Sequence, residues 1–257
     1  MIDDIDVNAS YLVKNKTRMD YFIPNYLEKL LSKNSKICSV GCGTGYDVEL
    51  LVKKGYDAYG FDPGNRVVDW INRSEKVQKR LKVGYAEDMP FGENQFDFMY
   101  ALEVIEHVGC KNGNWQLLEN YTETREKFLN SCLAMLRPNG KLLISSSNKL
   151  FPIDVGHGHH YNKLTNLMAS KGIALTVPWH SKNFLLSYYD FYRLLQESKY
   201  RDQIKIKQIS SYKYPSFSNS RRGIVYKKII NGILLVFNVY PINRLNPILV
   251  VLIENTI

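Results

Sequence analysis

The sequence predicts an α/β fold built on a mostly parallel sheet that helices cover on both faces. Short apolar segments of strand length alternate with segments of helical periodicity along most of the 257 residues, which is typical of parallel βαβ units with right-handed crossovers. The segment ILVVLI at 248–253 is apolar throughout, as expected of a strand buried on both faces. Ligands of such sheets bind beyond the carboxyl ends of the strands, so the residues that follow each strand are candidates for a site.

Apolar runs and helical spacing place the elements in order along the chain. The expected strands cover 36–40, 56–61, 81–85, 96–104, 141–146, 204–209 and 248–253. The expected helices cover 11–33 with an interruption near Pro24, then 46–54, 67–74, 121–136 and 188–198. We expect Pro138 and Gly140 in the sequence RPNG to end the helix over 121–136.

Composition and charge narrow the class of protein. Hydrophobic residues make up 45% of the chain and charged residues 23%, which is ordinary for a globular protein with a sizeable core. The net charge of +9 favours anionic partners such as nucleic acid, anionic lipid or acidic glycans, although a lysine-rich proteome would give the same excess.

Several features of the sequence favour a cytoplasmic protein. The four cysteines contain no CxxC pair, which argues against a disulfide framework or a zinc site. The opening MIDDIDVNAS is acidic and has no apolar core, so we expect no secretory signal in it. The apolar stretch 229–240 is interrupted by polar residues and is too short to span a bilayer.

A glycine-rich turn follows the first expected strand. Its spacing is G-x-G-x-G, with glycines at 41, 43 and 45; glycines permit a tight turn and a close approach of a ligand to the backbone. Asp62 lies 21 residues after Gly41, at the tip of the second expected strand, where a carboxylate can accept hydrogen bonds from both hydroxyls of a ribose. The dinucleotide fingerprint G-x-G-x-x-G would require glycine at 46, which is Tyr46. A purely structural strand-to-helix turn is the alternative interpretation.

Four motifs in series make the interpretation specific. ICSVGCGTG, FDP, AEDMPFGENQFDFMYALEVIEHV and LRPNGKLLIS occur in that order within 36–146. They resemble the class I S-adenosylmethionine-dependent methyltransferases, most closely the ubiquinone-biosynthesis-type branch. The resemblance implies a Rossmann-like three-layer sandwich with a seven-stranded, mostly parallel sheet whose last strand is antiparallel. It further implies one domain over 1–257, with a helical cap at 1–35, a core at 36–209 and 248–257, and an insertion at 210–247.

The resemblance also implies a set of residues that would contact S-adenosylmethionine. They are Gly41, Cys42, Gly43 and Gly45 beneath the methionine part, Asp62 at the ribose, Tyr85, Ala86 and Glu87 beside the adenine, and Ala101 and Leu102 at the methyl-bearing end. Two positions depart from the family pattern. The family usually has an acid two residues before the first glycine, where this chain has Ser39, and position 85 is often polar. Weaker or rerouted contacts to the ammonium group of the cofactor are therefore expected, and a partner-dependent site stays open.

Two polar clusters are candidates for chemistry. The first is E-x-x-E-H at Glu103, Glu106 and His107; a helical turn there would place all three on one face, where they could hold a divalent ion or supply His107 as a base. This pattern resembles the metal motif of small-RNA 2′-O-methyltransferases and of some quinone O-methyltransferases. A helix-start cap with a packed histidine is the alternative.

The second cluster lies in the loop after the fifth expected strand. It contains Asp154 and the histidines at 157, 159 and 160. His157 is a candidate base, or the loop could complete a metal site with the first cluster. A solvated or substrate-binding loop without a role in proton transfer is the alternative.

The insertion over 210–247 is not accounted for by the family pattern. Basic residues at 221, 222, 227 and 228 precede the apolar stretch, so 221–240 could touch a membrane interface. Packing on the sheet or contact with a second copy in a homodimer is the favoured alternative.

These observations lead to one principal functional hypothesis and two alternatives. The principal one is S-adenosylmethionine-dependent O-methylation of a hydroxyl on a small metabolite, a lipid-linked intermediate or a glycan, by a cytoplasmic protein that touches a membrane at most peripherally. The alternatives are a metal-using RNA 2′-O-methyltransferase, against which no separate RNA-binding module is recognisable, and a non-catalytic scaffold with the methyltransferase fold.

Overall fold

The computed structural model describes residues 2–64, 66–111, 116–151, 183–214, 232 and 234–256, with side chains from Leu12 onward. Within these residues, seven strands form one sheet in the order β3-β2-β1-β4-β5-β7-β6. The strands are β1 (Lys36–Val40), β2 (Asp57–Asp62), β3 (Leu81–Val83), β4 (Phe96–Leu102), β5 (Leu136–Ser147), β6 (Ile204–Gln208) and β7 (Ile248–Asn255). Of these strands, β7 alone runs in the direction opposite to the other six, which confirms the predicted fold class.

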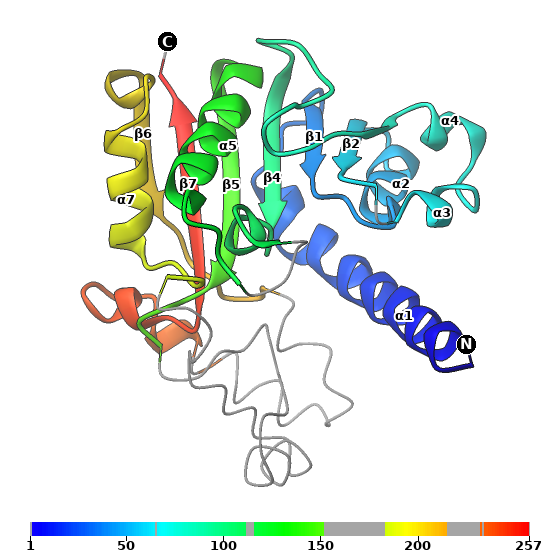
Figure 1. Ribbon diagram of the computed structural model, residues 1–257, viewed down its shortest axis with the longest axis horizontal. Coiled ribbons are helices and arrows are strands. Elements are labelled where there is room, and N and C mark those ends of the chain that lie inside the picture. The colour runs from blue at the N-terminus through cyan, green and yellow to red at the C-terminus, as the bar shows by residue number, and fades with distance from the viewer. Residues whose placement is uncertain are drawn as a thin grey trace, which may run out of the picture.

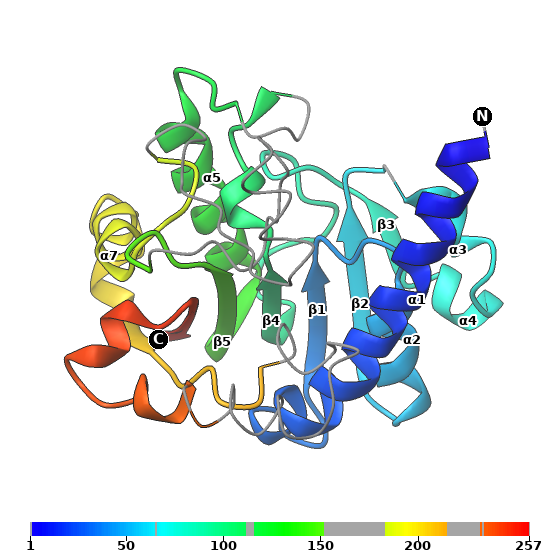
Figure 2. The ribbon, with the colours of Figure 1, turned by 90° about the horizontal axis from the view of Figure 1, so that it is seen from below.

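Helices cover both faces of this sheet (Figures 1 and 2). The α-helices described are α1 (Ile2–Asn25), α2 (Tyr46–Lys53), α3 (Val67–Trp70), α4 (Glu75–Gln78), α5 (Tyr121–Met135) and α7 (Tyr188–Gln196). Four short 3₁₀ turns among the described residues are η1 (Leu27–Lys29), η2 (Ile105–His107), η4 (Arg201–Gln203) and η6 (Ile242–Leu245). α5 and α7 lie on one face, and α1 and α2 lie on the other.

The three layers follow from the alternation of side chains along buried strands. In β4, Met99 and Ala101 belong to the core packed by α5 and α7. Their neighbours Phe98 and Tyr100 belong to the core packed by α1 and α2. Successive side chains of a strand point to opposite faces, so a run that is apolar on every residue supplies both cores and removes both faces from water.

Among the predicted boundaries that differ from the structure, two differ for identifiable reasons. α1 covers 2–25 rather than 11–33 and ends one residue after Pro24. Proline has no backbone N–H to donate, and at this position the missing hydrogen bond falls in the last turn of the helix. The sequence RPNG does not separate α5 from β5, because α5 ends at Met135 and β5 begins at Leu136. It forms an irregular start of β5, with a register shift against β4 and Asn139 at a φ of 63°.

The first residues after β6 bind α1 to the sheet. Tyr214 is fully buried, and its ring packs edge-on against the rings of Phe22 and Tyr26 of α1. Most of the segment 221–240 lies outside the described residues, so its predicted membrane or dimer contact stays a prediction. No helix within the described part of the chain is both long enough and apolar enough to cross a bilayer.

The order of the strands fixes where a ligand can bind. β1 pairs with β2 on one side and with β4 on the other. β2 and β3 extend the sheet from one edge of β1, and the later strands extend it from the other edge, so the strand order switches between β1 and β4. In open α/β sheets, ligands bind at this switch point, beyond the carboxyl ends of the strands. The glycine turn after β1 lies at that point.

Candidate functional site

The glycine turn is a rigid link between β1 and α2. The N–H groups of Gly41 and Cys42 both donate to the carbonyl of Phe61, at 2.9 and 3.0 Å, and the Gly45 N–H donates to the Cys42 carbonyl at 2.9 Å. Gly41, Gly43 and Gly45 adopt φ values of 69°, 52° and 68°, a region that side-chain-bearing residues rarely adopt. The turn is therefore tied to the end of β2.

Two of these glycines are required by their neighbours as well as by their backbone. A Cβ atom on Gly41 would lie 2.6 Å from Cγ2 of Val104, which follows β4. A Cβ atom on Gly45 would lie 2.5 Å from Cδ1 of Leu81 in β3. The turn consequently packs tightly against the ends of two other strands, with no room for a side chain.

Asp62 ends β2 beneath this turn. Its Oδ2 accepts a hydrogen bond from the Gly43 N–H at 3.0 Å, and its Oδ1 accepts one from the Gly64 N–H at 3.4 Å. Burial raises the pKa of the Asp62 carboxyl, while these N–H donors and the charge of Arg66 partly offset that rise. Each carboxylate oxygen can accept more than one hydrogen bond, so Asp62 retains capacity for hydroxyl donors from a ligand.

The other turn and β4 positions differ in what they expose. The Cys42 side chain is buried in the core beneath α2, so only its backbone faces the turn. Ala101 is fully buried in the opposite core, among residues of α5 and α7. Leu102, the last residue of β4, lines a cavity beside the turn. Of the two predicted β4 residues, the structure therefore places Leu102 on that cavity and Ala101 in the core.

The predicted adenine-side residues follow β3 in a tight turn. β3 ends at Val83, two residues earlier than predicted. Tyr85 and Asp88 exchange backbone hydrogen bonds at 3.0 and 3.2 Å. Within that turn Tyr85 is 57% exposed, Ala86 packs partly against the core and Glu87 is exposed. This exposure leaves the Tyr85 side chain accessible to a planar ligand, on which an aromatic ring can stack.

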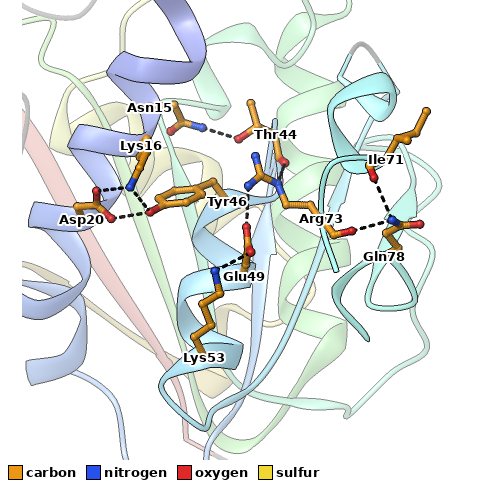
Figure 3. Close-up of polar contacts among 10 residues, drawn as sticks. All are labelled: Asn15, Lys16, Asp20, Thr44, Tyr46, Glu49, Lys53, Ile71, Arg73 and Gln78. Carbon is orange, nitrogen blue, oxygen red and sulfur yellow. Dashed lines mark hydrogen bonds and ion pairs between the residues drawn. The ribbon is translucent and has the colours of Figure 1, made fainter. Parts of the chain in front are cut away.

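Helix α1 is fastened over the glycine turn by polar side chains (Figure 3). The Asn15 amide donates to the Thr44 hydroxyl at 2.8 Å. The Lys16 ammonium donates to the Tyr46 hydroxyl at 2.9 Å and to Asp20 at 3.1 Å, and the Tyr46 hydroxyl donates to Asp20 at 2.7 Å. Although α1 precedes β1 by ten residues, it forms part of the wall of the site.

The segment after β2 holds the turn from the other side. The Trp70 indole N–H donates to the Gly43 carbonyl at 2.8 Å. The Arg73 guanidinium donates to the Thr44 carbonyl at 3.1 Å and pairs with Glu49 at 2.6 Å (Figure 3). These bonds occupy the turn carbonyls and fix the backbone against which a ligand would lie.

A small cavity of about 70 Å³ lies between α1 and the glycine turn. It is lined from α1, from the end of β1 and its turn, from α2 and from β4, by Asn15, Arg18, Met19, Ser39, Val40, Gly41, Cys42, Asp47, Tyr100 and Leu102. The carboxyl ends of β1 and β4 meet here, so the cavity occupies the switch point of the sheet.

Asp47, the second residue of α2, is a buried acid on this cavity. Its Oδ2 accepts hydrogen bonds from the Ser39 hydroxyl at 2.5 Å and from the Tyr100 hydroxyl at 2.7 Å. Burial raises the pKa of the Asp47 carboxyl, and the two hydroxyl donors offset part of that rise. Asp47 and Tyr100 were not among the predicted site residues; the available signal for Asp47 was an acid eight residues after the serine that replaces the usual acid.

The structure does not bring the E-x-x-E-H residues together. Glu103 has a φ of 57° and forms an ion pair with Arg18 of α1 at 3.1 Å. Glu106 is fully buried, and the His107 ring packs edge-on against Phe184 with ring centroids 5.4 Å apart. The expected single helical face is wrong, because η2 is a 3₁₀ turn that starts only at Ile105.

No metal cluster is formed by the described residues, where no three His, Cys, Asp or Glu side chains are placed to hold an ion. His157 and the other residues of the histidine loop lie outside the described residues, so their predicted roles stay predictions. The role of His107 as a base likewise stays a prediction. Arg18, Trp70 and Arg73 bound the site and were missed by the sequence analysis, because their partners lie far away in the chain.

Comparisons with known proteins agree with this geometry. The family model described as "Methyltransferase domain" matches residues 13–198. The ubiquinone biosynthesis O-methyltransferase of Azorhizobium caulinodans is 32% identical over 46% of this chain and 42% of its own. The phosphoethanolamine N-methyltransferase of Plasmodium falciparum is 30% identical over 45% of this chain and 40% of its own. The chain thus spans about half the length, or less, of the curated relatives it matches.

One solved structure is similar over nearly the whole chain. It is a chain of the complex between the Haloferax volcanii Trm112 methyltransferase activator and the putative methyltransferase. The similarity covers 99% of this chain and 96% of that chain, with a TM-score of 0.54 and 14% identity. At this identity the likeness is one of fold.

Proposed function

Because the chain belongs to the methyltransferase-domain family, in its class I S-adenosylmethionine-dependent group, we propose that it transfers a methyl group from S-adenosylmethionine to a hydroxyl oxygen. The acceptor is a small metabolite, a lipid-linked intermediate or a glycan. The observation that carries the proposal is the glycine turn between β1 and α2, with Asp62 hydrogen-bonded to its Gly43 N–H at 3.0 Å. A cavity at the switch point of the sheet lies beside it.

The residues present fit the proposed methyl donor. When bound, S-adenosylmethionine supplies an electrophilic methyl group on a positively charged sulfur. The three glycines of the turn carry no side chain of their own, and Asp62 has lone pairs left for two ribose hydroxyls. In the proposal Tyr85 stacks on the adenine, and Leu102 borders the end of the ligand that carries the methyl group. The protein thereby contributes position and orientation to the transfer.

Oxygen as the acceptor is supported by the curated relatives named ubiquinone biosynthesis O-methyltransferase. A hydroxyl nucleophile needs a base or a metal ion to remove its proton. His107 and His157 are the proposed bases, and a divalent ion is the alternative. If either histidine carries the proton, its replacement by Ala lowers turnover by roughly 100-fold. A loss below about threefold with intact cofactor binding would exclude the replaced residue from that role.

The first experiment measures binding of the demethylated product. We expect S-adenosylhomocysteine to bind in a calorimetric titration, whereas NAD, run beside it at the same concentrations, does not. A panel of hydroxyl acceptors and amine acceptors is then tested with and without Mg²⁺. Methylation of amines alone would overturn the oxygen assignment, and absence of binding of S-adenosylhomocysteine would overturn the proposed function.

A further inference from the structure

The Asp47 carboxylate has one satisfied oxygen and one without a partner. Oδ2 receives both the Ser39 and the Tyr100 hydroxyl. Oδ1 is buried and accepts no hydrogen bond from any residue that the structure describes. The N–H groups at the start of α2 help to lower the carboxyl pKa but form no hydrogen bond with Oδ1. A buried carboxylate oxygen without a donor is costly, and such a group calls for a functional explanation.

On the α1 side of the cavity, Arg18 has a donor without an acceptor. Arg18 uses its terminal nitrogens on Glu103 at 3.1 Å and on the Tyr214 hydroxyl at 3.3 Å. Its Nε is buried without an acceptor among the described residues. Arg18 and Asp47 line the same cavity. The cavity is therefore lined by a carboxylate with one oxygen that lacks a donor and by a guanidinium with one N–H that lacks an acceptor, which are the complements of the ammonium and carboxylate groups of an α-amino acid.

We propose that Asp47 binds the ammonium group of the amino-acid end of S-adenosylmethionine, in place of the acid that the family pattern has at position 39. The inference rests on the proposed function and adds a binding residue to it. Arg18, across the cavity, faces the carboxylate of the same end. Asp47 comes from the start of α2 rather than from β1, so the acid reaches the cavity from a different element.

Ser39 helps to hold the Asp47 carboxylate in place. Ser39 is 2% exposed and its hydroxyl donates to Asp47, so the residue at the usual acid position orients the substitute acid. Tyr100 of β4 is the second donor to the same oxygen. Two donors on Oδ2 fix the carboxylate and leave Oδ1 for a charged donor, which forms the stronger kind of hydrogen bond. Ser39 and Tyr100 are positioning residues in this arrangement.

The decisive variant is Asp47→Asn, which keeps the size of the side chain. Its amide oxygen can still accept from Ser39 and Tyr100, but its NH₂ group replaces the unpaired oxygen and presents a donor to the ammonium group. We expect the affinity for S-adenosylhomocysteine, measured by calorimetry, to fall roughly 10- to 100-fold. Affinities for 5′-methylthioadenosine and for the analogue of S-adenosylhomocysteine without its α-amino group should change less than about threefold, because neither has the ammonium group.

A swap of the two positions provides the matched control. Ser39→Asp combined with Asp47→Ser returns an acid to the usual position and should recover most of the lost affinity for S-adenosylhomocysteine. Retained binding of 5′-methylthioadenosine shows that each variant is folded. Unchanged binding of S-adenosylhomocysteine by Asp47→Asn, or an equal loss for all three ligands, would overturn the role of Asp47 while leaving the proposed function intact. If the unaltered protein binds none of the three ligands, the proposed function itself fails.

Discussion

Asp62 at the tip of β2 and Asp47 in the first turn of α2 are both buried acids beside one glycine turn, but they are held differently. Asp62 accepts backbone N–H groups from residues 43 and 64. Asp47 accepts side-chain hydroxyls from β1 and β4. Backbone donors are present whatever the side chains are, whereas hydroxyl donors depend on two particular residues. The orientation of the Asp62 carboxylate is therefore fixed by the backbone of the turn, and that of the Asp47 carboxylate by side chains of the sheet.

The largest expected effect is a loss of ligand affinity in Asp62→Ala, which should differ from Asp47→Asn in the ligands that it weakens. Asp62→Ala removes the proposed acceptor of two ribose hydroxyls, so affinity for S-adenosylhomocysteine should fall roughly 100-fold or more. Unlike Asp47→Asn, it should weaken 5′-methylthioadenosine to a similar degree, since that compound retains the ribose. Calorimetry of both variants with both ligands makes the comparison. Selective loss of S-adenosylhomocysteine in Asp62→Ala would contradict the assignment.

The turn between the two acids should respond to a single added methyl group. Gly41→Ala places a Cβ atom 2.6 Å from Val104 and keeps a positive φ of 69°, which together should cost about 2–4 kcal/mol of unfolding free energy. Chemical denaturation measures the loss. The double variant Gly41→Ala with Val104→Ala should recover part of it, because the atoms that clash are removed. No recovery would assign the cost to the backbone alone.

The smallest expected effect is on the stability of the unliganded protein. Burial raises the pKa of Asp47 above its ordinary value of 3.8, so ionisation of this carboxyl costs more free energy in the folded state than in the unfolded chain. This cost is present above the raised pKa and disappears as the pH falls below 3.8. Asp47→Asn should therefore melt no lower than the unaltered protein at pH 7, with the difference shrinking toward pH 4.

The environment of Asp47 makes this test interpretable. The groups that face the carboxyl are the hydroxyls of Ser39 and Tyr100 and the thiols of Cys38 and Cys42, with Arg18 across the cavity. Asp62 titrates in both proteins and cancels in the comparison. Thermal melts at several pH values give the difference, and a variant that melts much lower at pH 7 would show that the carboxylate supports the fold.

The sequence predicted the features that depend on local pattern. The central strands appear as apolar runs, and Asp62 could be found because it stands at the end of one of them. The spacing of eight residues between Ser39 and Asp47 was a usable signal for their pairing, whereas the contribution of Tyr100 depends on a strand 53 residues away in the chain. His107 shows the same limit, because Phe184, its packing partner, lies 77 residues away in the chain. RPNG was misassigned because a bulged strand start uses the same residues as a helix stop.

Cys42 gives the glycine turn a built-in chemical reporter. Cys42 is 5% exposed, and burial raises the pKa of its thiol well above the usual value, so we expect alkylating reagents to attack it only when the turn opens. The alkylation rate of Cys42, separated by peptide mass from that of the more accessible Cys110, therefore measures the opening frequency of the turn. A ligand that closes the turn would protect this thiol, and the degree of protection would report occupancy without any knowledge of the methyl acceptor.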